Sequence, residues 1–196
     1  PENASAKNLE LMNSINCFRI SFGLECGNEK FRREVVKRAP TNEEIISNFD
    51  TIAESGIAFS VNNMIGFPDE TREMVFETID LNRELQGYDS LTVSIFTPYR
   101  GTDLRELAVK SGYIEEDSMA THTTSSSTLN MPQFTSAEID GLMRTFTSYV
   151  QFPKEEWPRI ALGEPDTEEG RKIFNEYHNR YSSLVFQGTQ ESRLEQ

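Results

Sequence analysis

The chain has 196 residues, 36% of them hydrophobic and 26% charged, and its 32 acidic and 19 basic residues give a net charge of −13. A surface this acidic repels phosphate backbones, so we expect no nucleic-acid partner. No apolar run approaches the about 18 residues that a membrane span needs, and the first residues do not resemble a signal peptide. The two cysteines, Cys17 and Cys26, form no disulfide framework, so the sequence predicts a cytoplasmic protein without a membrane span.

Strand-like and helix-like segments alternate along the first 114 residues. The expected elements are strands at 17–24, 58–65 and 90–96, and helices at 42–54, 70–85 and 103–110, the first of which opens at a capping box at 41–44. This alternation predicts neighbouring parallel strands with the helices on one side. Three strands cannot close an eight-stranded barrel, so the residues alone indicate an open, twisted partial sheet of the α/β class.

After residue 114 the alternation of strands and helices ends, and the sequence predicts a loop followed by helices. A capping box at 135–138 opens a helix at 136–150, and a second helix is expected at 167–186. We expect the segment between them to be ordered and anchored by Phe152 and Trp157. The chain therefore divides into a lead-in segment at 1–14, a partial α/β unit at 15–114 and a loop at 115–134. A helical extension at 135–187 and a disordered tail at 188–196 follow.

Polar residues at the end of the first strand are the first candidate for a binding site, because function in parallel α/β sheets lies at the carboxyl ends of strands. Glu25 follows Gly23-Leu24 and can accept two hydrogen bonds from a ribose diol. Gly27 would let a ligand approach the backbone. A solvated glutamate before a turn is the competing interpretation. The cysteines have no histidine or third cysteine at ligand spacing, so we expect structural thiols rather than metal ligands.

Two further strand ends carry candidate residues. Asn62 and Asn63 stand next to each other in an apolar strand, so their side chains point to opposite faces and at most one of them faces the binding side. The third strand breaks at Pro98, which leaves the backbone groups of Phe96 and Thr97 free to meet a ring edge. An ordinary helix start after the second strand and an ordinary loop after the third are the alternatives.

Taken in order, these segments resemble one family. Gly23-Leu24-Glu25, then Arg38, then Gly-Phe-Pro-Asp-Glu-Thr at 66–71 and Pro-Tyr-Arg-Gly-Thr at 98–102 look like strands four to six of a radical S-adenosylmethionine (radical SAM) barrel. Residues 152–158 and their flanks are similar to the C-terminal extension of the cobalamin-binding class. The resemblance implies a partial, half TIM-type barrel with parallel strands, followed by a helical C-terminal extension.

The resemblance also implies roles for particular residues. Glu25 stands where the family supplies a polar group to the ribose or methionine end of SAM, and Arg38 where a guanidinium approaches the carboxylate. Asn62 matches a position that reaches the ribose hydroxyls. Backbone groups of Phe96 and Thr97 lie where adenine binds, and Ser21 is a further residue on the binding face.

The implied cofactors are SAM, a 4Fe-4S cluster and, in the cobalamin-binding class, cobalamin. The cluster generates a 5′-deoxyadenosyl radical and is held by a Cys-x₃-Cys-x₂-Cys motif, which this sequence lacks. We therefore expect a fragment that is inactive alone, whose cluster ligands and N-terminal half lie outside the chain, and whose parent is an enzyme.

Several alternatives and partners remain open on the sequence. The chain could instead be a non-catalytic half-barrel module that binds an adenosyl ligand or a partner chain. An unrelated flavin- or phosphate-dependent α/β enzyme would normally have a glycine-rich phosphate loop, and none is present. The expected partners are a small-molecule substrate, the missing N-terminal half and a second copy that pairs through the exposed strand edge.

Overall fold

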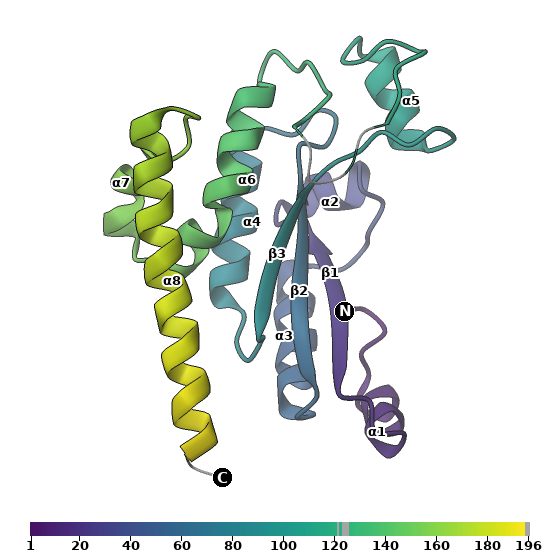
Figure 1. The fold of residues 1–196 in the computed structure, drawn as a ribbon. Helices are drawn as coiled ribbons and strands as arrows, with labels where there is room; N and C mark the ends of the chain where they lie inside the picture. Colours follow the sequence, from purple (N-terminus) through teal and green to yellow (C-terminus); the bar gives the residue numbers. More distant parts are fainter. Residues whose placement is uncertain (121, 123–125, 195–196) are drawn as a thin grey trace.

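The fold is that of a computed structural model, which describes residues 1–120, 122 and 126–194, with side chains described as far as residue 184. Its centre is a parallel sheet in the order β1 (Arg19–Glu25), β2 (Ala58–Ile65) and β3 (Ser90–Ile95). The parallel sheet with its helices confirms the α/β class and is compatible with part of a barrel (Figure 1).

Side chains alternate between the two faces of the sheet with the period of two that β-strands impose. One face is apolar and packs on helices; it carries the side chains of Phe22, Phe59, Val61, Leu91 and Ile95. The opposite face carries mostly polar side chains and is here called the polar face. Its members are Arg19, Ser21, Ser60, Asn62, Met64, Ser90, Thr92 and Ser94.

Two helices connect the strands. Helix α3 (Asn42–Glu54) begins at the expected capping box, in which Thr41 accepts from the Glu44 amide and Glu44 accepts from the Thr41 amide. Helix α4 (Arg72–Glu84) begins at Thr71, whose hydroxyl accepts from the Met74 amide. Each helix places apolar side chains against the sheet, which is why both crossovers return the chain to a neighbouring parallel strand.

Shorter helices lie at the two ends of the sheet. Helix α1 (Ala6–Ser14) lies near the amino ends of the strands, and α2 (Glu29–Glu34), which sequence patterns missed, lies at their carboxyl ends (Figure 1). Helix α5 (Asp103–Lys110) has the expected bounds but lies beyond the carboxyl ends, so the expectation of three helices on one side is wrong for it. The guanidinium of Arg105 holds α5 there by donating to the carbonyls of Pro98, Glu116 and Ser118.

The C-terminal residues form a helical layer that packs on the sheet. Helix α6 (Ser136–Gln151) contacts β3 and α4. A 3-10 turn (Lys154–Glu156), α7 (Trp157–Ala161) and α8 (Glu168–Leu194) follow. Helix α8 passes through residues 188–194, where we expected a disordered tail; Gly188 alone costs about 1 kcal/mol, which does not end a helix.

Arg83 of α4 fastens this layer to the sheet. Its Nη1 lies 2.9, 2.8 and 2.7 Å from the carbonyl oxygens of Tyr149, Val150 and Phe152, at the end of α6. These carbonyls have no partner within the helix, because the last turn of any helix leaves its carbonyls free. Trp157 adds a hydrogen bond from its ring nitrogen to the Tyr149 carbonyl, at 3.1 Å. The expected anchoring by Trp157 is thus present.

We expect Arg83→Ala to lower the free energy of unfolding by about 1–3 kcal/mol, since it leaves these carbonyls without a charged donor. Urea denaturation measures this change. Arg171→Ala is the matched control, because Arg171 pairs with Asp166 at a site where the two side chains are 58% and 67% exposed. The control should change stability by less than about 0.5 kcal/mol. Equal effects of the two substitutions would contradict the role given to Arg83.

Candidate functional site

The end of β1 bends sharply at Glu25. Pairing of β1 with β2 shifts register between Gly23 and Glu25, and Glu25 has a φ of 69°, in the left-handed region. This conformation costs a non-glycine residue roughly 1–2 kcal/mol, and such strained residues cluster at binding sites. A Cβ on Gly23 would lie 2.2 Å from Oε1 of Glu25, so the carboxylate lies over Gly23. Gly23 therefore makes room for the carboxylate.

Glu25 and Asn62 lie on the same face of the sheet. Gly23 pairs directly with Asn62 across the parallel strands, and paired residues project to one side. Because the Glu25 carboxylate covers Gly23, it stands on the polar face beside Asn62. Ser21 also lies on this face, where its hydroxyl is 2.8 Å from that of Ser60.

The two adjacent asparagines divide between the faces, as expected. Asn63 is buried on the helix side and exchanges two hydrogen bonds with Asn82 of α4, at 3.1 and 2.8 Å. Asn62 is on the polar face, where its Oδ1 accepts from the Thr92 hydroxyl at 2.8 Å. One asparagine is therefore structural, and the other is available at the candidate site.

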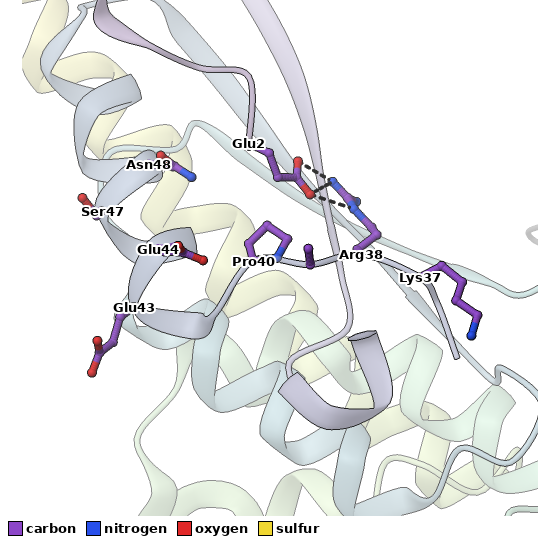
Figure 2. Close-up of a pocket in the computed structure, with 9 residues that line it drawn as sticks. Glu2, Lys37, Arg38, Pro40, Glu43, Glu44, Ser47 and Asn48 are labelled. Atoms are coloured by element: carbon purple, nitrogen blue, oxygen red, sulfur yellow. Dashed lines mark hydrogen bonds and ion pairs between the residues drawn. The ribbon is translucent and has the colours of Figure 1, made fainter. Parts of the chain in front are cut away.

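Arg38 lies beside Glu25 at the end of β1. Its Nη1 donates to the Gly23 carbonyl at 3.0 Å and lies 3.5 Å from Oε1 of Glu25. Nε and Nη2 form a two-pronged contact with the carboxylate of Glu2, at 3.0 and 2.8 Å (Figure 2). Burial raises the pKa of the Glu25 carboxyl, and the nearby Arg38 opposes that rise.

A hollow of about 880 Å³ opens next to Arg38 on the outer side of β1 (Figure 2). Its lining comes from Glu2, the turn at 37–40 and the first part of α3. Arg38 is the one candidate residue that lines it. Glu25 and Asn62 instead stand on the polar face, so we locate the candidate site on that face and not in the hollow.

Phe96 and Thr97 are both buried at the end of β3. The amide of Phe96 donates to the Ile65 carbonyl at 2.8 Å, and the carbonyl of Thr97 accepts from the Tyr99 amide at 2.9 Å. The ring of Phe96 packs on that of Phe67, with centroids 5.5 Å apart. The expectation that Pro98 leaves these backbone groups free is thus wrong for two of them, because pairing with the end of β2 occupies the Phe96 amide and the turn at Tyr99 occupies the Thr97 carbonyl.

Gly27 does not serve ligand approach. A Cβ at this position would lie 2.5 Å from the backbone of α4 at Glu77 and Thr78, and the Gly27 amide donates to the Thr78 hydroxyl at 2.7 Å. The glycine is needed because α4 passes directly against the loop. The expectation of a ligand contact at Gly27 is therefore wrong.

A buried carboxyl, Glu70, holds the turn that leaves β2. Its Oε2 accepts from the amides of Gly66 and Phe67, at 2.5 and 3.1 Å, while Oε1 is buried without a hydrogen-bond partner in the described part of the chain. Burial raises the pKa of Glu70 to about 8, although the two amides lower it. The preceding residue, Asp69, has a φ of 67°. Its carboxylate accepts from the Tyr113 hydroxyl at 2.5 Å, and this bond joins the turn to the segment after α5.

The chain is similar to several known proteins. Residues 3–81 match the radical SAM superfamily. The comparisons support membership of the radical SAM superfamily. An uncharacterized methyltransferase of Pyrococcus horikoshii is 30% identical over 141 residues, which cover 72% of this chain and 30% of that relative.

Two tRNA-2-methylthio-N(6)-dimethylallyladenosine synthases are also similar. The protein from Thermotoga petrophila is 34% identical over 71 residues, 35% of this chain and 16% of its own. That from Clostridioides difficile is 31% identical over 88 residues, 44% of this chain and 18% of its own. The chain spans less than a third of the length of these curated relatives.

The radical SAM family implies a 4Fe-4S cluster, and the residues of this chain do not fit one. Across residues 1–120, 122 and 126–184, whose side chains are described, no three His, Cys, Asp or Glu side chains gather where they could hold a metal ion. Cys26 is fully buried, and burial raises its thiol pKa to about 12, so it remains a protonated thiol at neutral pH. No helix in the same residues is long and apolar enough to cross a membrane.

Three residues that bear on the candidate site were not found from the sequence. Thr92 donates to the side-chain oxygen of Asn62, and Glu70 accepts from the amides of the turn after β2. Glu2 accepts from the guanidinium of Arg38. Thr92 could have been found from the alternation Ser90, Thr92, Ser94 in the third strand. The other two depend on how the chain folds back, which no local pattern reveals.

We expect the stability of the protein to fall as the pH rises from 4.5 towards about 8, because the folded state keeps a proton on Glu70 that the unfolded chain loses near its ordinary pKa of 4.5. Glu70→Gln has no such proton and should remove this part of the pH dependence. Urea denaturation of both proteins at several pH values in that range measures it. Identical pH slopes for the two proteins would contradict a protonated Glu70.

Proposed function

We propose that this chain is the part of a radical SAM enzyme that binds the ribose and adenine of SAM, and that the chain is inactive alone. The observation that carries the proposal is the juxtaposition of Glu25, over Gly23, with Asn62 on the polar face. A carboxylate that accepts and an amide that donates suit the two hydroxyls of a ribose. The match of residues 3–81 to the superfamily supports the same assignment.

The chemistry of the parent enzyme comes from its cofactor. In this proposal a 4Fe-4S cluster would be held by ligands outside this chain and would supply the electron that splits SAM into methionine and a 5′-deoxyadenosyl radical. The residues described here would orient the adenosyl group. Arg38 would bind the carboxylate of SAM after its contact with the Glu2 carboxylate is broken. Phe96 and Thr97 would border the adenine. Cobalamin in the parent rests on the resemblance of residues 152–158 alone.

We further propose that the substrate is a small molecule. Two relatives carry names of tRNA-modifying enzymes, but the net charge of −13 makes this part of the protein repel an RNA backbone. The relative named a methyltransferase makes methyl transfer a reaction to test first.

The test is equilibrium binding of S-adenosylhomocysteine by the full-length protein. Glu25→Gln and Asn62→Ala should each raise Kd about 10-fold, the effect of losing one hydrogen bond in a binding site. Glu169→Gln and Asn175→Ala change the same residue types on the exposed side of α8 and serve as controls. Unchanged affinity in both site variants would contradict the proposal.

We also propose that another part of the protein covers the free side of β1. Strand β1 is an edge of the described sheet, and apolar side chains stand exposed next to it: Leu11 is 64% exposed, Ile15 70% and Phe18 85%. Exposed strand edges and apolar patches are typical of interfaces. The partner that fits a parallel barrel is the missing N-terminal half; a second copy through the same edge is the alternative when the chain is alone.

We therefore expect the isolated chain either to self-associate through this edge, with about 1,000 Å² or more of surface buried, or to keep residues 1–14 folded over it. Size-exclusion chromatography with light scattering measures the oligomeric state, at a salt concentration that screens the net charge. If the chain self-associates, Phe18→Asp should shift it towards monomer, and Met119→Asp, which changes a residue 83% exposed elsewhere, should not. A monodisperse monomer in which the β1 edge faces solvent would refute this prediction.

A further inference from the structure

Thr92 and Asn62 form a directly paired couple on the polar face. The two residues are register partners in the parallel pairing of β2 with β3, so their side chains stand next to each other. The Thr92 hydroxyl donates to Oδ1 of Asn62 at 2.8 Å. Thr92 is exposed and Asn62 is half-buried, so the couple borders the open side of the sheet.

This hydrogen bond has a chemical consequence for Asn62. An asparagine amide can turn either its oxygen or its NH₂ group towards a ligand, because the two ends have nearly the same shape. With its oxygen engaged by Thr92, Asn62 offers its two N–H groups to the open side. A ligand must then present a hydrogen-bond acceptor at this point.

The neighbouring hydroxyls on the polar face have other partners. Ser94 donates to the Asn63 carbonyl at 3.3 Å, and Ser60 is 2.8 Å from the Ser21 hydroxyl. The hydroxyl of Ser90 accepts from Arg19 at 2.8 Å. Among the described residues Thr92 is therefore the hydroxyl that bonds the Asn62 side chain.

We propose that Thr92 is a positioning residue, which fixes the Asn62 amide as a donor to a ribose hydroxyl oxygen of the adenosyl ligand. This inference rests on the proposed function, because it assumes that Asn62 meets the ribose. It goes further by assigning the direction of the hydrogen bond and the residue that sets it. Thr92 itself does not touch the ligand.

The test is a double-mutant cycle in the full-length protein, with the Kd for S-adenosylhomocysteine as the readout. Thr92→Val is nearly isosteric and removes only the hydroxyl, and Thr92→Ser restores it. Thr92→Val should weaken binding about 5-fold, the effect of one misoriented hydrogen bond, and Thr92→Ser should return Kd to near its original value. In the Asn62→Ala background, Thr92→Val should have no further effect.

Asn62→Asp tests the direction of the bond to the ligand. A carboxylate still accepts from Thr92 but cannot donate, so this variant should bind as weakly as Asn62→Ala. If Asn62→Asp keeps the original affinity, the oxygen faces the ligand and the inference is overturned. The inference is also overturned if Thr92→Val leaves Kd unchanged, or if it raises Kd equally in the original and the Asn62→Ala proteins. An Asn62→Ala protein with unchanged affinity would instead refute the ribose role in the proposed function. Thermal unfolding of each variant checks that the fold is kept.

Discussion

The strict alternation of side chains across three in-register parallel strands is the constraint on which the structure depends. It sends Phe59, Val61 and Ile65 to the helices and Ser60, Asn62 and Met64 to the opposite face. Burial of the apolar face against the helices stabilises the fold, so the polar face does not need to pack against them. At the end of β1 the register shifts, so that Glu25 pairs with Asn63, but the Glu25 carboxylate still lies over Gly23 and therefore on the polar face.

Three arginines, of which Arg32 and Arg105 are buried and Arg83 is half-buried, hold segments of the chain that lie outside the sheet. Arg32 donates to the carbonyls of Cys26 and Pro40, at 2.7 and 2.6 Å, and so closes the loop that follows β1. Arg105 does the same for the segment around α5, and Arg83 for the end of α6. A guanidinium suits this task because its five donors are fixed in one plane and stay charged when partly buried. The loops at the carboxyl ends are thereby rigid enough to present a site.

Sequence patterns predicted those parts of the fold that depend on local periodicity. Strands β2 and β3, the two capping boxes and the bounds of α5 all follow from residues close in sequence. The position of α5, the contact of Gly27 with α4 and the Glu2–Arg38 pair could not be predicted, because each joins segments far apart in the chain. At the candidate site, the resemblance supplied Glu25 and Asn62, but Thr92 appears only once the register of β2 and β3 is known.

The buried pair of Asn63 and Asn82 has a consequence for how the fold assembles. The two amides satisfy each other only when α4 is seated on β2 in its final position. A partly docked helix would leave the side-chain oxygens of both asparagines buried without their donors, at a cost of about 1–3 kcal/mol each, although Asn82 and Asn63 would still donate to the carbonyls of Thr78 and Thr92. Intermediate positions of α4 are therefore unfavourable, and the strand and its crossover helix join in one cooperative step. The Asn63–Asn82 pair thus makes the docking of α4 on β2 all-or-none. Hydrophobic contacts alone would not do so, because they persist when a helix slides along a sheet.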